Sequence, residues 1–499
     1  MAEELKAFGY DIEIIKVAKL FLDDLPTVKA KLADATGLFD DNEVVINDFL
    51  KPYHLSTTDL TKASRRILVL QRRGDLLRKS KGLNYLAALC IQHILGRITT
   101  NQVFENRAKR QAYIIDSLKS PAEVDLFRTV FHDGFCMIGA VADDTVRRRR
   151  LEDQKGIGNS VFDAISEIDA GETQEKHGQH ATETILQADY FFENNFDKPA
   201  KIKTECARLL NLLFQSEIET PRQDEYGMHM AHMAGDRSAC LSRQVGAAII
   251  SATNTVLATG HNDVPKFGGG LYTTESKEDN RCFAKSAKCY NDEEKHLLAD
   301  QIIHVFRSKN LDIDNDTFSK MKAILLKETR LKLLIEFTRA VHAEMDAIIS
   351  VARDGKPGLV GSTMYVTTYP CHNCAKHIID AGIKRVVYLE PYSKSLAQKL
   401  HPDAINDPRE APSESKVTFS NYGGVSPERY AFWFSSHGDR KHDGRMIRKS
   451  WDKATMLPLC AQEIEYLIST AENFSKWFAE VEIPPNAQDR TIPLDVVQL

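Results

Sequence analysis

The sequence lacks the features that direct a chain into or across a membrane. No apolar run approaches the roughly 18 to 20 residues that a membrane span requires. The N-terminus, residues 1–6, also lacks the charged-then-apolar order of a signal peptide. The nine cysteines are an odd number scattered over 499 residues, which favours free thiols and metal ligands over a disulfide framework. We therefore expect a cytoplasmic protein with no membrane partner.

The chain also lacks a net positive charge. The chain has 65 Lys and Arg residues against 70 Asp and Glu residues, which gives a formal net charge of -5 at pH 7. A protein that grips nucleic acid usually presents a basic face, so we expect no polynucleotide partner, whereas a small anionic ligand needs only a few local cations. The dense basic run Arg147 to Arg150 is compatible with a site for a phosphate or a nucleic acid, or with a solvated helix face.

A glycine-rich phosphate loop is missing as well. The pattern G-x-x-x-x-G-K-S/T, whose backbone amides hold the phosphates of a nucleoside triphosphate, occurs nowhere in the chain. Several glycines fall instead in the polar stretch 152–180, which predicts a mobile loop or a plain surface excursion. The sequence therefore excludes a phosphate cradle of that type.

What is present is the composition of a folded globular protein, with 42% hydrophobic and 27% charged residues. A chain of this length predicts two or three domains. The first predicted domain spans residues 1–200. It alternates apolar strands at 10–18, 111–118 and 134–141 with helical stretches such as 121–130, an order that predicts parallel βα units.

The second predicted domain spans residues 201–499. From about residue 222 the pattern is helix, strand, strand, helix, strand, helix, strand and helix. The predicted strands are 245–251, 255–262, 363–368 and 385–389, and helices are predicted from 342, over 371–381 and over 395–400. Residues from about 263 to 335 form an insertion that is glycine-rich, then charged, then helical. The fold class is therefore α/β, with one three-layer domain in this half.

The residues that carry chemistry lie in this second domain. Cys371 and Cys374 are three apart at the start of a predicted helix, so both sulfurs project to one side of one turn, and the positive helix end favours thiolates. His342 begins the neighbouring helix and supplies an imidazole. Three protein ligands leave a tetrahedral zinc ion with one open position, as a catalytic site requires. We therefore expect Zn2+ as the cofactor.

Glu344 completes the pattern two residues after the first ligand. Water in the open zinc position has its pKa brought down to about 7, and Glu344 is near enough to take its proton and pass it to a ring nitrogen and to leaving ammonia. H-x-E followed by P-C-x-x-C is the signature of zinc deaminases, so Glu344 is the predicted catalytic residue. The alternatives are a structural zinc or two buried thiols. A structural site normally has a fourth protein ligand, and the adjacent His372 would point away.

These motifs lie in a segment, about 222–435, that resembles the deoxycytidylate deaminases of the cytidine deaminase superfamily. The likeness includes the segments 242–250 and 259–265, which are similar to the family's first two strands. It implies that Asn262 hydrogen-bonds the deoxyribose 3'-hydroxyl. The family often has Asn two residues after the catalytic Glu, where this chain has Asp346.

The whole chain is similar to a narrower group, the bacterial anti-phage dCTP/dCMP deaminases, which deplete deoxycytidine nucleotides. The likeness lies in residues 113–119, 189–194, 224–227, 264–270 and 390–396. It implies a P-loop-kinase-like N-terminal domain, here lacking its first strand and Walker A loop, and a homo-oligomer. We expect no kinase activity. Asp116 would be the metal-assisting acid of a working P-loop protein, or else a turn residue at the end of a strand.

Several weaker patterns are left with two interpretations each. Lys266 and Lys394 follow strands and would bind substrate phosphates, or be solvated lysines, and Arg243 would contact substrate or cap a helix. Cys282, Cys289 and His296 have a spacing compatible with a second, structural zinc. The aromatic residues between Tyr422 and Trp433 would stack a base, or form core or a subunit contact. The remaining cysteines fit small core residues: Cys90, Cys136, Cys206, Cys240 and Cys460.

Together these observations predict an enzyme that hydrolytically deaminates free deoxycytidine nucleotides, dCTP or dCMP, to dUTP or dUMP. Its expected partner is therefore a small-molecule nucleotide. Two alternatives remain: a polynucleotide cytidine or adenosine deaminase, which would use the same zinc chemistry, and a nucleotide-sensing regulatory protein with an inactive deaminase domain.

Overall fold

The computed structural model describes nine stretches of the chain: 1–23, 50–100, 110–170, 179–195, 199–309, 311–392, 395–406, 413–436 and 438–447. The chain divides into two compact units, one formed by residues 1–220 together with those from 431 onward and the other by 221–430. The boundary predicted after residue 200 therefore falls about one helix too early. Helix α11 (Pro199–Phe214) belongs to the first unit, because Phe214 stacks on Phe8 with ring centres 5.2 Å apart.

The first unit contains the predicted parallel strands, paired two by two. Strand β1 (Tyr10–Lys16) pairs in parallel with β2 (Arg110–Asp116), and β3 (Ile138–Val141) pairs in parallel with β4 (Tyr190–Glu193). Its other helices are α1 (Ala2–Ala7), α2 (Val17–Asp23), α5 (Lys62–Lys81), α6 (Tyr85–Thr100), α7 (Pro121–Phe131), α8 (Asp144–Lys155), α9 (Asn159–Ala170) and α10 (Ala181–Leu186). The α/β alternation predicted here is confirmed.

The loop predicted over 152–180 is wrong for most of its length. Helix α8 continues to Lys155, and α9 occupies residues 159–170. Helix α9 forms because Val161, Ile165 and Ile168 recur at helical spacing and are buried together with Leu68 of α5. The polar residues between them obscured this apolar stripe in the sequence.

The basic run 147–150 lies on α8 and is engaged within the unit. Arg148 pairs with Asp144 at 2.6 Å and also with Asp163. Its guanidinium lies 4.3 Å from the centre of the Phe162 ring. These contacts favour the interpretation of this run as a helix face over a phosphate site.

The second unit is built on a five-stranded sheet in the order β6-β5-β7-β8-β9. Its strands are β5 (Gly246–Ile250), β6 (Val256–His261), β7 (Thr363–Thr368), β8 (Arg385–Glu390) and β9 (Thr418–Asn421). Strand β5 pairs antiparallel with β6 and β7, whereas β7, β8 and β9 are parallel. The first four strands were predicted almost to the residue. Strand β9 was missed because its four residues, Thr-Phe-Ser-Asn, include only one apolar side chain.

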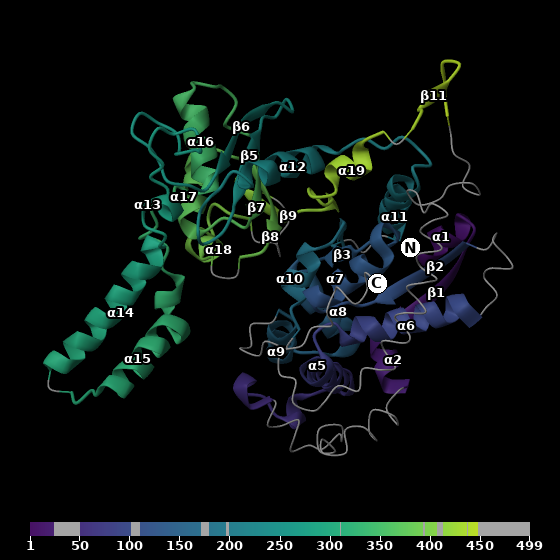
Figure 1. Ribbon diagram of the computed structural model, residues 1–499, viewed down its shortest axis with the longest axis horizontal. Helices are drawn as coiled ribbons and strands as arrows, with labels where there is room; N and C mark the ends of the chain where they lie inside the picture. The colour runs from purple at the N-terminus through teal and green to yellow at the C-terminus, as the bar shows by residue number, and fades with distance from the viewer. Residues whose placement is uncertain are drawn as a thin grey trace. The chain divides into compact units, whose positions relative to one another are not determined.

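Helices cover both faces of this sheet (Figure 1). Helix α12 (Gln223–Gly235) packs on one face, and α16 (Ala343–Arg353) and α17 (His372–Asp380) contribute to the core on the other. The two helices begin where sequence analysis placed them, and α18 (Ala397–Leu400) follows β8 as predicted. The three-layer arrangement predicted for this half is therefore confirmed.

Two glycines allow the layers to approach closely. A Cβ at Gly246 would overlap the backbone of α12 at Ala231, and a Cβ at Gly260 would overlap the backbone of α16 at Ala343 and Ala347. Only glycine avoids these overlaps, since any other residue adds that atom. The start of α16 is thus set directly against the end of β6.

The described residues of the insertion form three helices and one short 3-10 turn. They are α13 (Cys282–Lys285), α14 (Tyr290–Ser308), α15 (Asn315–Glu328) and η5 (Arg330–Leu333). Helices α14 and α15 form a hairpin that projects from the sheet (Figure 1). The smaller elements elsewhere are η2 (Lys51–Tyr53), η3 (Thr57–Asp59), η4 (His132–Gly134), β10 (Gly424–Val425), α19 (Tyr430–Phe434), β11 (Lys441–His442) and β12 (Arg445–Met446). No helix in the described part of the chain is long and apolar enough to cross a membrane.

Candidate active site

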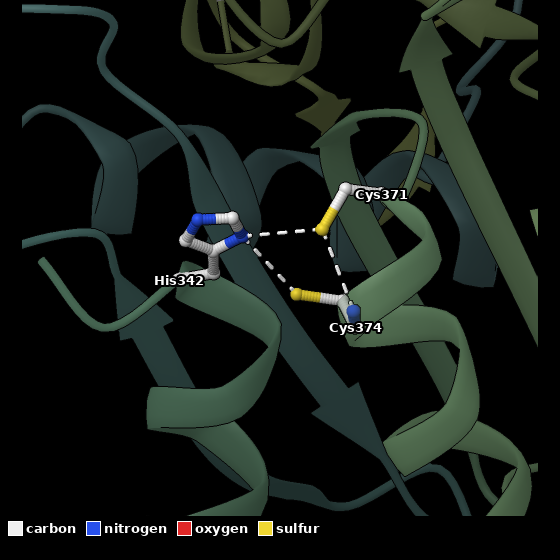
Figure 2. Close-up of side chains that lie close together, drawn as sticks. All are labelled: His342, Cys371 and Cys374. Atoms are coloured by element: carbon white, nitrogen blue, oxygen red, sulfur yellow. Dashed lines mark hydrogen bonds between the residues drawn. The ribbon is translucent and has the colours of Figure 1, made fainter. Parts of the chain in front are cut away.

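Two helix starts bring the metal-ligand candidates together. His342 is the N-cap of α16, and Cys371 is the N-cap of α17 with Cys374 one turn further along. The Nδ1 atom of His342 lies 3.4 Å from the Sγ of Cys371 and 3.3 Å from the Sγ of Cys374 (Figure 2). Within the described stretches, these three residues form the one group of at least three His, Cys, Asp or Glu side chains whose ligand atoms all lie within 4.8 Å of one another.

The geometry of this group fits a zinc ion. Zn–N bonds of about 2.0–2.1 Å and Zn–S bonds of about 2.3 Å at tetrahedral angles place nitrogen and sulfur about 3.5 Å apart, close to both distances given above. No fourth His, Cys, Asp or Glu from the described residues joins the group. This donor set therefore matches a catalytic site, which keeps one position open, better than a structural site, which closes it.

The protonation of the three ligands is tightly linked. Hydrogen bonds from Cys374 and then His342 lower the pKa of the Cys371 thiol to about 4, so its thiolate forms readily. The pKa of Cys374 is raised, first because its thiol donates a hydrogen bond to Cys371 and then because it is buried. Burial alone would lower the pKa of His342, but its contact with Cys371 raises that pKa to about 9. A metal ion must therefore displace protons to bind, and acid opposes binding.

Glu344 lies in the first turn of α16, beside the three ligands. Its side chain is buried, with 4% of the residue exposed. Burial raises the pKa of its carboxyl, an effect partly offset by the nearby charge of His342 and by a hydrogen bond with Cys374. A carboxyl that touches the metal-ligand set and has a raised pKa is suited to exchange protons near neutral pH.

Four strand ends meet at the edge of the sheet next to these residues. Strand β5 begins at Gly246, which pairs with His261 at the end of β6, and the backbone N–H of Gly246 donates to the Oγ1 of Thr367 at 3.1 Å. Strand β7 ends at Thr368, which pairs with Glu390 at the end of β8. Cys371 follows β7 by three residues. We call this the metal-site edge of the sheet.

Asn262 follows β6 at the metal-site edge and is 8% exposed. Its Oδ1 accepts from the backbone N–H of Val245 at 2.8 Å, and its Nδ2 donates to the backbone oxygen of Arg243 at 2.8 Å. The side chain thus holds the segment that enters β5. One N–H and one lone pair of its amide are left over after these two bonds.

Asp346 takes the place of the family's usual Asn and makes a backbone contact. Its carboxylate accepts from the N–H of His261 at 3.2 Å and lies 3.9 Å from the Nδ1 of that imidazole. An Asn oxygen would accept the same N–H equally well. The departure from the family pattern therefore preserves the link between the end of β6 and α16.

The two predicted phosphate-binding lysines have different outcomes. Lys266 is exposed in a tight loop, where its backbone N–H donates to the backbone oxygen of Gly270 at 3.0 Å. Gly269 of this loop lies near the side chain of Arg353, the last residue of α16, whereas His342 caps the first turn of that helix. This placement lends no support to a position for Lys266 beside the ligands. Lys394 lies outside the described residues.

Arg243 does not cap a helix. Its side chain is exposed and pairs with Glu390, with 2.9 Å between its Nη1 and Oε1. Its guanidinium also lies 6.0 Å from the ring centre of Tyr392. Glu390 was not singled out as a site residue, although its position at the end of a parallel strand that borders the motif could have identified it.

The remaining candidates are placed as follows. Cys289 contacts Ser242, with 3.3 Å between Sγ and Oγ, and Cys282 lies on α13. Among the described residues, Cys282, Cys289 and His296 do not form a group whose side-chain ligand atoms lie close enough together to share one metal ion. A second zinc therefore stays a prediction. Asp116 ends β2 with an exposed side chain and belongs to no such group among the described residues.

The aromatic stretch is mainly core. Tyr422 is 1% and Trp433 is 6% exposed. Tyr430 stacks on His229 at 4.1 Å between ring centres. The two most buried rings have no surface to offer a base, which favours the interpretation of this stretch as packing.

Comparison with known proteins covers the same part of the chain. Residues 221–390 match the family described as the cytidine and deoxycytidylate deaminase zinc-binding region. The deoxycytidylate deaminase of Enterobacteria phage T4 is 32% identical over 170 residues, which are 34% of this chain and 78% of the phage protein. The human deoxycytidylate deaminase is 24% identical over 180 residues, 35% of this chain and 71% of that protein.

Among solved structures, the dCMP deaminase of cyanophage S-TIM5 in complex with dCMP and dUMP is similar with a TM-score of 0.24 and 18% identity, over 40% of this chain and 98% of that one. The match to the phage T4 protein covers 78% of that relative, and the family match over residues 221–390 includes the three metal-ligand residues. The chain therefore belongs to the cytidine and deoxycytidylate deaminase family and is a zinc deaminase with His342, Cys371 and Cys374 as its metal ligands.

Proposed function

We propose that this protein hydrolyses the 4-amino group of free deoxycytidine nucleotides, dCMP or dCTP, to the corresponding deoxyuridine nucleotides. The observation that carries the proposal is the zinc-ligand set with buried Glu344 in contact with it. The similarity to deoxycytidylate deaminases supports the choice of substrate class. The net charge of -5 favours a free nucleotide over a polynucleotide as the substrate.

Glu344 is proposed as the catalytic residue that moves both protons. His342, Cys371 and Cys374 would hold the zinc ion, which would lower the pKa of the attacking water to about 7. The carboxylate of Glu344 accepts a proton from that water and delivers it to N3 of the pyrimidine, and it then carries a second proton to the departing amino nitrogen. The C4–N bond breaks, a C4–O bond forms, one water is consumed and ammonia leaves.

The proposed sugar contact is Asn262, whose amide retains one donor and one acceptor after its two backbone bonds. It would use them for the deoxyribose 3'-hydroxyl. The proposed phosphate contacts are Lys266 and Lys394. For Lys266 the loop would have to bend toward the metal-site edge, since it now lies along α16.

Ammonia release by the zinc-loaded full chain tests this function. We expect release from dCMP or dCTP and none from single-stranded DNA, and Glu344→Ala should abolish it while zinc stays bound. Turnover of single-stranded DNA alone would replace the proposal with a polynucleotide deaminase. Bound zinc with no turnover of any deoxycytidine compound would indicate a regulatory protein with a silent site.

We propose in addition that the first unit is a P-loop-kinase-like α/β unit without a phosphate loop. The two parallel strand pairs support this, as does the resemblance of the whole chain to anti-phage deaminases. The proposed role is depletion of deoxycytidine nucleotides during phage infection. Nucleotide pools in infected cells that carry wild-type protein or the Glu344→Ala variant test it: only the wild type should lower deoxycytidine nucleotides.

A further inference from the structure

We infer that Arg243 binds the 5'-phosphate of the substrate and makes the site select nucleotides over nucleosides. The inference rests on the proposed function and adds the residue that recognises the phosphate. It is carried by the juxtaposition of Arg243, Asn262 and Glu390 at the metal-site edge of the sheet. Lys266, the other proposed phosphate contact within the described residues, lies in a loop near Arg353 at the far end of α16.

The backbone of Arg243 is fixed next to the proposed sugar site. Asn262 donates to the carbonyl oxygen of Arg243 at 2.8 Å and accepts from the N–H of Val245 at 2.8 Å. The residue proposed to hold the 3'-hydroxyl therefore also holds the chain from which the guanidinium extends. The 5'-phosphate is attached to the same sugar ring, so it lies within the region that this long side chain sweeps.

The side chain of Arg243 lies beside residues that border the metal site. Its guanidinium lies 6.0 Å from the ring centre of Tyr392, and Tyr392 packs against the core cluster that contains Cys371. Its ionic partner Glu390 ends β8 opposite Thr368, three residues before Cys371. A positive charge is thus presented at the rim of the metal site.

The pairing of Arg243 with Glu390 is weak enough to be exchanged. The two side chains are 45% and 26% exposed, and ion pairs this open to solvent contribute little. A phosphate carries more negative charge than a carboxylate and accepts a guanidinium fork with two parallel hydrogen bonds. It should therefore displace Glu390.

Glu390 has a second partner that remains after the exchange. The Oγ1 of Thr368 donates to its other carboxylate oxygen at 3.3 Å. The carboxylate consequently keeps a hydrogen bond when the guanidinium turns toward substrate. In the free protein, Glu390 holds Arg243 at the rim; in the complex, the phosphate takes its place.

The test compares kcat/KM for dCMP and for deoxycytidine with the zinc-loaded full chain. Arg243→Gln should lower kcat/KM for dCMP about 100-fold, mainly through KM, and change that for deoxycytidine less than about threefold. Arg243→Lys, which keeps the charge but loses the fork, should lose about tenfold on dCMP. The matched control is Arg330→Gln, an exposed arginine in η5, with no expected change on either substrate.

Glu390→Gln separates the two roles of the pair. It removes the competitor for Arg243, so KM for dCMP should fall by a few-fold. A rise in KM equal to that of Arg243→Gln would overturn the inference, because the pair would then act as one structural unit. Equal losses of Arg243→Gln on dCMP and deoxycytidine, or no loss on dCMP, would overturn it as well. If the wild type releases ammonia from none of dCMP, dCTP and deoxycytidine, the proposed function itself fails and the inference with it. If it acts on dCTP but not on dCMP, the same comparison is made between dCTP and deoxycytidine, with the same expected losses.

Discussion

Two polar clusters in the deaminase unit lie toward opposite ends of strand β8. One surrounds its carboxylate with hydrogen-bond donors, whereas the other buries its carboxyl and raises its pKa. At the start of the strand, Arg385 donates two hydrogen bonds to Asp224, at 2.7 and 2.8 Å, and the hydroxyl of Tyr365 donates a third at 2.8 Å. Toward its end, at the metal-site edge, Glu344 is buried and burial raises the pKa of its carboxyl. The first carboxylate is satisfied and ties α12 to the sheet; the second retains reactivity that the site can use.

The largest expected effect comes from removing a metal ligand. Cys374→Ala deletes one of three donors, and the remaining pair should not retain zinc during purification. We expect zinc content well below one per chain and turnover below detection, measured by metal analysis and ammonia release. Retention of zinc and activity would show that the described ligand set is incomplete. A substitution in the Asp224 cluster should leave the zinc content unchanged.

Glu344→Gln should lower kcat by about 10²- to 10⁴-fold, the usual contribution of a positioned acid and base. Zinc should remain bound. Because burial raises the pKa of this carboxyl, its charged form is disfavoured in the folded state, and that penalty applies at pH above the raised pKa. A neutral amide removes the penalty, so thermal unfolding at pH 7 should give a free energy of unfolding that is equal or higher. A less stable variant would mean that the Glu344 carboxylate stabilises the fold through its hydrogen bonds, as Asp224 does.

The pH dependence of kcat/KM tests whether Glu344 has a raised pKa. The base form of Glu344 is lost as pH falls through its raised pKa, so kcat/KM should drop about tenfold per pH unit on an acid limb that lies above the ordinary range of a glutamate. An acid limb at or below the ordinary pKa of glutamate would remove Glu344 as its source.

The smallest expected effect is on stability alone. Asp224→Asn weakens the charged hydrogen bonds from Arg385, whose side chain is 38% exposed against 29% for Asp224. We therefore expect a loss of only about 1 kcal/mol in the free energy of unfolding. Activity at a temperature where the variant is folded should stay within about threefold of wild type. A large loss of activity without loss of stability would break the division between the two clusters.

Sequence analysis predicted the reactive cluster and not the satisfied one, for a physical reason. His342, Glu344, Cys371 and Cys374 fall into two short motifs whose internal spacing is dictated by one metal ion. The contact between Asp224 and Arg385 joins residues 161 apart. No local pattern encodes that partnership, because it depends on how α12 is laid across the sheet.

The same distinction explains the errors in the fold. Strands β5 to β8 each contain a short apolar run and were located almost to the residue. Helices α5 and α6 of the first unit were not identified, and α9 was assigned to a loop. In α9 polar residues interrupt the apolar positions, and the packing partners of those apolar positions come from elsewhere in the chain, such as Leu68. Arg243 was identified as ambiguous, and its partner Glu390 became apparent only when β8 was placed beside β7.

Gly260 gives the protein a vulnerability that no inspection of its reactive groups would reveal. A single methyl group there would collide with the carbonyl of Ala343 and the amide of Ala347, so the first turn of α16 would be wedged outward together with both His342 and Glu344. A mutational library that spares every side chain of the catalytic centre but randomises this position would still lose most of its active members. The position of the first turn of α16 therefore depends on the absence of a side chain at Gly260.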